Sequence, residues 1–136
     1  MSTKIESKHV EINKSVQEVF DFVKDFNNIE QVLPKDKISD WKSDFDQCSF
    51  KIQNAAVIPL VKESVIEPNT INIVSGEKTP FPFTLKITFN ALATDKTEVF
   101  LNFDGEINAF LKMMVVKPLN SLFNFMAAEL KTVCEK

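Results

Sequence analysis

The sequence of 136 residues predicts one α+β domain in which an antiparallel sheet packs against a long C-terminal helix. Residues 38–105 alternate apolar and polar side chains with a period of two, which is typical of strands with one buried face. From about Phe110 to Glu135, apolar residues instead recur every three or four positions, which indicates a helix. The connections within the period-two region are short, so neighbouring strands are expected to be antiparallel.

The N-terminal part predicts one strand followed by two short helices. The strand covers Lys4–Ile12 and is followed by Ser15, which is suited to cap a helix, with Glu18 as its capping-box partner. Apolar residues at helical spacing predict a helix over about 16–24. Residues 25–32 predict a turn and a second short helix, which Pro34 ends.

Six further strands are predicted in the period-two region. The clearest alternation is Thr84–Asn90, and residues 93–96 supply the turn to the strand that follows. The predicted strands are 38–42, 48–53, 60–67, 70–76, 83–92 and 97–105.

The C-terminal helix is expected to pack on this sheet through one apolar stripe. Pro118 interrupts the pattern, so we expect a kink there or the start of a second helical part. The residues expected to grip the sheet are Leu119, Leu122, Met126 and Leu130.

The composition supplies much apolar surface and little reactive chemistry. The chain has 13 phenylalanines, no tyrosine, no arginine and one histidine, and its formal charge is −3. Without a basic patch or arginine, a nucleic-acid partner is not expected. No apolar run approaches the roughly 18 residues of a membrane span, and no signal peptide is visible, so we expect no stable membrane insertion. Cys48 and Cys134 are expected to be reduced thiols in a cytoplasmic protein.

Two segments resemble the SRPBCC superfamily, which includes START-like lipid carriers, the birch-pollen-allergen type and small bacterial polyketide cyclases. Residues 10–26 resemble its opening strand and helix, with Val19-Phe20 at the helix centre and an acid near the end. Residues 117–130 are similar to the terminal helix of its bacterial members. The resemblance implies the helix-grip fold. In that fold a curved antiparallel sheet of about seven strands wraps around the terminal helix, and two short helices follow the first strand.

The resemblance also implies a cavity between sheet and helix, with its mouth at Asn54–Pro59, Gly76–Phe83 and Gly105–Ala109. Phe81 and Phe83 would overhang that mouth. Alternation directs one set of strand side chains towards the helix, and methionine suits a site that adapts its shape. The expected ligand-binding residues are Phe50, Ile52, Glu63, Phe81, Phe83, Leu85, Ile87, Phe89, Val99, Leu101, Phe103, Met114, Leu122 and Met126. The alternative is that the phenylalanines fill this space as ordinary core.

The ionisable candidates are few. Residues 60–67 direct either Glu63 or Lys62 inward, depending on the phase of the strand. Asp104 and Glu106 border the implied mouth, where paired carboxylates can perform acid–base chemistry. His9 is interpreted as a surface or hydrogen-bonded residue. We therefore predict no catalytic residue, no metal site and no cofactor.

Three functions fit these observations. The leading hypothesis is the binding or transport of a small hydrophobic molecule, lipid-like or polyketide-like, without catalysis. The second is an aromatase/cyclase-type enzyme, although the lack of tyrosine and arginine removes the usual donors for a developing enolate. The third is a protein-interaction module of the chaperone-activator type, for which Phe100 gives a weak sign of an exposed apolar patch. The sequence specifies neither the ligand nor the oligomeric state.

Overall fold

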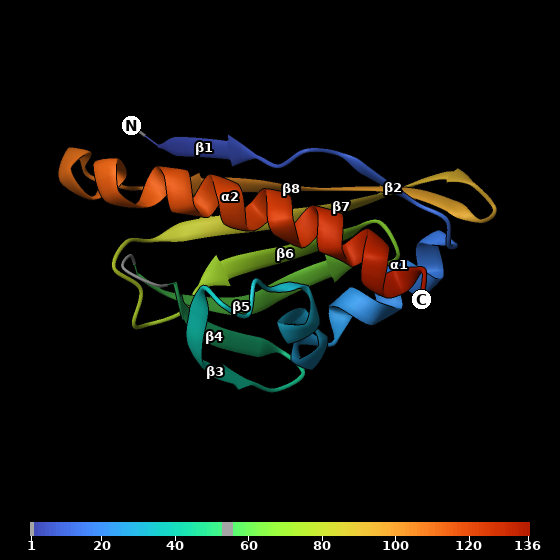
Figure 1. Ribbon diagram of the computed structural model, residues 1–136, viewed down its shortest axis with the longest axis horizontal. Helices are drawn as coiled ribbons and strands as arrows, with labels where there is room; N and C mark the ends of the chain where they lie inside the picture. The colour runs from blue at the N-terminus through green and yellow to red at the C-terminus, as the bar shows by residue number, and fades with distance from the viewer. Residues whose placement is uncertain (1, 53–55) are drawn as a thin grey trace.

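The computed structural model describes residues 2–52 and 56–136. It contains an antiparallel sheet in the order β1-β8-β7-β6-β5-β4-β3, with β2 also paired to β8. The long helix α2 (Ala109–Cys134) lies across one face of this sheet, along β8 and β7, as Figure 1 shows. This is the helix-grip α+β architecture that the sequence predicts.

The strands follow the alternation in the sequence closely. Each boundary lies within three residues of the predicted one, and β5 differs most because it begins earlier. Position 53, at the end of the predicted strand 48–53, lies outside the described residues. The strands of the period-two region are β3 (Ile38–Ser43), β4 (Gln47–Ile52), β5 (Val57–Ile66), β6 (Thr70–Ser75), β7 (Phe83–Ala93) and β8 (Lys96–Gly105).

The first strand is interrupted, which the sequence analysis did not predict. It forms β1 (Thr3–Glu6) and β2 (Val10–Ile12), both antiparallel to β8. In the gap, Ser7 bonds to Leu101 twice: its amide donates to the Leu101 carbonyl at 2.9 Å, and its hydroxyl accepts from the Leu101 amide at 2.9 Å. The Lys8 amide is then free to donate to Asn124 Oδ1 of α2 at 2.7 Å. The interruption thus joins the sheet edge to the helix.

Two short helices follow, as predicted. The helix α1 (Val16–Lys24) is capped by Ser15, whose hydroxyl accepts from the Glu18 amide at 3.2 Å. The second helix, η1 (Phe26–Val32), is a 3-10 helix that Asp25 caps in the same way through the Asn27 amide.

The helix α2 is one continuous element that contains Pro118, so this proline does not start a separate helix. All four residues predicted to grip the sheet are buried. The C-terminal end of α2 is fixed to the β2 segment, because Lys131 Nζ donates to the Glu11 carbonyl at 2.9 Å and Glu135 Oε2 accepts from the Asn13 amide at 2.7 Å. Among residues 2–52 and 56–136, no side-chain hydrogen bond joins the first two turns of α2 to a strand. Figure 1 shows its first turns projecting past the ends of the strands.

Candidate functional site

The space between the sheet and α2 is filled by side chains rather than open. Twelve of the fourteen residues expected to line a cavity are buried there, each with at most 7% of its surface exposed. A void of about 20 Å³ remains among residues of α1, η1, β7, β8 and α2. A space of about 10–15 Å³ of this kind is enough for one water molecule, so the void has room for about one water and not for a ligand. The buried twelve are Phe50, Ile52, Phe81, Phe83, Leu85, Ile87, Phe89, Val99, Leu101, Phe103, Leu122 and Met126.

Aromatic packing explains why the expected mouth is closed. Phe81 and Phe83 do not overhang an entrance but turn inward, where Phe83 lies 5.4 Å from Phe103 between ring centroids. Phe103 in turn lies 5.4 Å from Phe123 of α2, so a row of rings connects β7, β8 and the helix. Gly105 is required here, because a Cβ atom at this position would lie 2.7 Å from the Phe103 ring. Asn54 and Ala55, in a third segment of the expected mouth, lie outside the described residues.

Glu63 and Met114 are not placed as the cavity hypothesis required. Glu63 is exposed at a bulge of β5, where the pairing with β6 shifts between Lys62 and Ser64. Met114 is 46% exposed, because it belongs to the projecting part of α2. Both residues lie on the surface, so the interior of the sheet contains neither.

Lys62 is the ionisable side chain that β5 directs inward, which was the other phase considered from the sequence. Its side chain is only 9% exposed and lies against two aromatic rings. The Nζ atom is 3.9 Å from the Phe45 ring centroid and 5.0 Å from that of Phe26, and it donates to the Phe45 carbonyl at 3.1 Å. Asp46 lies 3.3 Å away as its ion-pair partner. These contacts tie β5 to the β3–β4 turn and η1, so Lys62 has a structural role and is not poised to react.

A groove of about 670 Å³ lies between α2 and the segment that joins η1 to β3. Two of the expected ligand-binding residues, Ile52 and Leu122, belong to its lining. The apolar part of the lining is Pro34, Ile38, Ile52, Pro118, Leu122 and Phe125. The polar part is Asp36, Lys37, Lys117 and Ser121. Small-molecule sites typically combine a mostly apolar wall with a few polar groups, and this groove has that character.

The sequence analysis missed eight of these ten lining residues. The sequence did contain a signal for Phe125, because this residue is apolar but lies outside the apolar stripe of the C-terminal helix. In the structure its side chain is 39% exposed. The segment from Pro34 to Ile38 carried none, since its position beside α2 depends on how the whole sheet curves.

A second hollow of about 710 Å³ lies over β4, β5 and β6. Its lining includes the charged side chains of Lys42, Asp44, Glu77 and Lys78. This charged lining suits an apolar ligand less well than the α2 groove does. We therefore take the α2 groove as the candidate site.

The remaining chemically reactive candidates lie outside the groove. Burial raises the pKa of the Cys48 thiol to about 12 and that of Cys134 to about 11, so both are protonated and unreactive near neutral pH. Asp104 is half-buried and Glu106 is exposed, and neither lines the groove.

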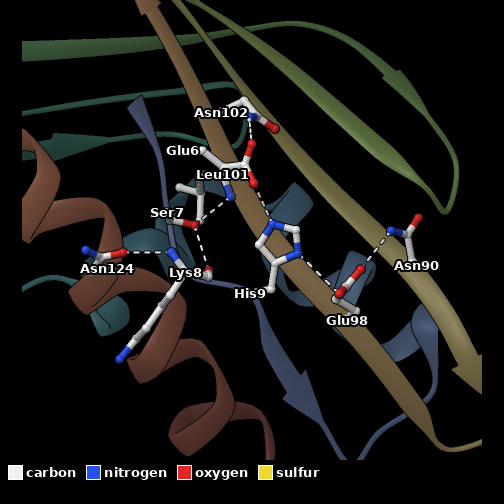
Figure 2. Close-up of polar contacts among 9 residues, drawn as sticks. All are labelled: Glu6, Ser7, Lys8, His9, Asn90, Glu98, Leu101, Asn102 and Asn124. Atoms are coloured by element: carbon white, nitrogen blue, oxygen red, sulfur yellow. Dashed lines mark hydrogen bonds and ion pairs between the residues drawn. The ribbon is translucent and has the colours of Figure 1, made fainter. Parts of the chain in front are cut away.

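His9 belongs to a polar cluster on the outer side of β8 (Figure 2). Its ring nitrogens lie 2.7 Å from Glu6 Oε2 and 3.2 Å from Glu98 Oε2. The His9 ring is stacked on Phe100 at 3.9 Å between centroids, so His9 covers one face of Phe100, which is half-buried. The hydrogen bond to Glu6, assisted by that to Glu98, raises the pKa of His9 above its ordinary value. The cluster links β1 and β8 at the point where the first strand is interrupted.

Among residues 2–52 and 56–136, no group of three or more histidine, cysteine, aspartate or glutamate side chains is arranged to hold a metal ion. Of the described helices, none has both the length and the apolar character needed to cross a bilayer.

Solved structures with the same architecture cover nearly the whole chain. A START superfamily protein from Mycobacterium smegmatis aligns with a TM-score of 0.70 and 17% identity, over 97% of each chain. Norcoclaurine synthase from Thalictrum flavum aligns with a TM-score of 0.77 and 9% identity, over 98% of this chain and 94% of its own. The Zhui aromatase/cyclase from a Streptomyces strain aligns with a TM-score of 0.76 and 12% identity, over 99% of this chain and 94% of its own.

The chain has the helix-grip fold of these proteins. No protein-family model matches it, and no curated sequence is similar to it. The likeness is therefore one of three-dimensional structure. Among these neighbours, norcoclaurine synthase is described in complex with dopamine and hydroxybenzaldehyde, and another is described as an aromatase/cyclase.

Proposed function

We propose that this helix-grip protein binds a small hydrophobic molecule in the groove between α2 and the segment 34–38. The observation that carries the proposal is the lining of the groove, in which six apolar side chains are joined by Lys37 and Lys117. The ligand would lie against the apolar wall, and the two ammonium groups would attract an anionic group at its end. The groove replaces the enclosed cavity as the binding place, because the interior is packed.

Binding without catalysis fits the chemistry of the groove better than an enzyme does. Its lining contains neither the single histidine nor a cysteine. Both cysteines of the chain are free, which supports a reducing, cytoplasmic location as part of the proposal.

An environment-sensitive anionic dye, anilinonaphthalene sulfonate, tests the proposal. The wild-type protein should bind it saturably. Ser121→Phe places a ring in the groove from an exposed position on α2, and it should weaken binding at least about tenfold by excluding the dye. Asn120→Phe is the matched control, since Asn120 is the adjacent residue, is equally exposed and does not line the groove.

Circular dichroism should show that both variants keep their fold. Equal dye affinity of the wild type and Ser121→Phe would contradict the groove as the site. An equal loss in both variants would mean that the dye binds elsewhere on α2.

A further inference from the structure

The N-terminal half of α2 has two apolar faces, and the protein covers only one of them. The covered face includes Val115, Leu119 and Leu122. On the other side, Phe110 is 73% exposed and Met113 is 86% exposed. A helix that is apolar all round normally has cover on every side, either from protein or from lipid. The outer face of this segment therefore lacks its apolar partner.

The charge of the same segment is positive. Residues 109–128 contain Lys112 and Lys117 and no acidic residue, while the other 14 of the 16 lysines share the rest of the chain with all 19 acidic residues. Within the described ranges, neither of the two helix lysines forms an ion pair. A protein with a net charge of −3 thus presents a cationic apolar segment at one end.

The acidic residues near this end do not cancel that charge. Asp104 lies opposite Lys4 in the pairing of β1 with β8, and Glu77 is followed by Lys78 in the chain. Asp36, which lines the groove together with Lys117, stands between Lys35 and Lys37 in the chain. Glu106 is then the acidic residue near the start of α2 that has no lysine beside it in the chain. The helix keeps an excess of positive charge where it projects from the sheet (Figure 1).

Other exposed apolar residues lie in a different electrostatic setting. Ile66 is 61% exposed and Leu92 is 50% exposed. They lie at the ends of β5 and β7, which run antiparallel to β6 and β8, so they are at the opposite end of the sheet from the start of α2. Acidic residues follow closely in the chain, with Glu67 after Ile66 and Asp95 after Leu92. Exposed apolar side chains and positive charge therefore coincide at the start of α2, but they do not coincide at the end of the sheet that carries Ile66 and Leu92.

We propose that the start of α2 docks on the surface of an anionic lipid bilayer. Phe110, Met113 and Met114 would enter the boundary between head groups and acyl chains. Lys117 lies on the same face of the helix as Phe110 and Met113, and its side chain would extend to the phosphate groups, since lysine keeps its ammonium group at the polar level while its stem lies in the apolar layer. Lys112 points to the other side of the helix and would add only to the overall positive charge of the segment. The apolar anchors of this proposal are separate from the dye-binding groove, because none of Phe110, Met113 and Met114 lines it, while Lys117 belongs to both surfaces.

Vesicle co-sedimentation tests the proposal. The full-length protein should bind phosphatidylcholine vesicles that contain phosphatidylglycerol, bind pure phosphatidylcholine much less, and lose binding as salt rises. The double variant Phe110→Ser/Met113→Ser should bind at least about tenfold less, because two exposed apolar anchors are removed. Lys117→Gln should reduce binding to the anionic vesicles about fivefold, the effect expected for one lysine near a charged surface, and Lys112→Gln should reduce it less.

The matched control is Ile66→Ser/Leu92→Ser, which removes two apolar side chains that are each at least half exposed at the other end of the sheet and should bind as the wild type does. Equal binding of both double variants, or no binding of the wild type to anionic vesicles, would overturn the proposal. Gel filtration covers the competing occupant: a dimer that Phe110→Ser/Met113→Ser dissociates would show that a second copy of the chain covers this face instead. Dye binding without vesicle binding would leave the groove proposal standing and refute this one alone.

Discussion

Leu101 is the residue at which a packed interior and an open cavity predict opposite results. Its side chain is 2% exposed and borders the void of about 20 Å³. Because that void has room for about one water molecule, it cannot take up the additional ring of an indole. Leu101→Trp should therefore overpack the interior and lower the free energy of unfolding by about 1–3 kcal/mol or more.

Leu101→Ala should also destabilise the protein, by a different mechanism. The change removes three carbon atoms, which at about 0.8 kcal/mol for each buried carbon group costs about 2.4 kcal/mol. The neighbouring side chains are themselves packed, so the space left behind stays partly open. The cavity term should bring the total loss to about 3–5 kcal/mol.

Leu92 provides the matched control for both substitutions. It is also a leucine in the same antiparallel pair, on β7, but it is 50% exposed. Leu92→Ala and Leu92→Trp should each change the free energy of unfolding by less than about 1 kcal/mol. Urea unfolding followed by far-ultraviolet circular dichroism measures all four variants. If Leu101→Trp keeps the stability of the wild type, the interior has room that a packed core does not, and an enclosed ligand cavity becomes the better hypothesis.

Two further predictions concern the polar clusters. The pKa of His9, followed through the single imidazole of the chain by NMR, should lie above its ordinary value, and Glu6→Gln should lower it more than Glu98→Gln because the bond to Glu6 is the larger cause. The contribution of His9 to the free energy of unfolding should be complete below about pH 6.5 and disappear as pH rises through its raised pKa. The contribution of Glu6 and Glu98, whose pKa values are lowered, should instead disappear as the pH falls into the acid range. A pKa of His9 that does not respond to Glu6→Gln would contradict this network. Lys62→Ala should lower the free energy of unfolding by about 1–3 kcal/mol, and Lys62→Met should lose less because it keeps the packing of the stem against Phe26 and Phe45. Equal losses in the two variants, measured by urea unfolding, would show that stem packing contributes nothing.

The sequence predicted the fold well because the decisive signals are local. Alternation in residues 84–90 fixes which side chains face inward, and the observed strand buries Leu85, Ile87 and Phe89 as that pattern requires. The capping box of Ser15 and Glu18 is also a local signal, and it appears as predicted. Interruption of the first strand could not be predicted in this way, since it depends on a bond between Ser7 and Leu101, 94 positions apart.

The candidate site was harder to predict, because inward orientation does not show whether a space is empty. Periodicity correctly predicted that Phe103 of the sheet and Met126 of the helix both point into the space between them, where both are buried. Whether rings then meet or leave a cavity depends on the curvature of the sheet and on the distance of α2 from it. Here Phe103 reaches Phe123 of the helix, so the same residues that could line a cavity form the core. The phase of β5 was equally undetermined, because the bulge at Glu63 changes which of its neighbours face inward.

The start of α2 shows where helical periodicity stops being a guide to burial. Apolar residues continue on the N-terminal side of Pro118 as far back as Phe110, and the sequence analysis expected Met114 to face the sheet. The connection between β8 and α2 is only the three residues 106–108, however, and β8 ends at Gly105. A helix that begins so close to the end of its preceding strand has its first turn at the border of the sheet, where no inward face remains to cover it. Phe110, Met113 and Met114 are therefore apolar at positions that the fold leaves in solvent. Packing within the chain gives no reason for side chains of this kind at these positions, whereas contact with an apolar phase outside the protein does.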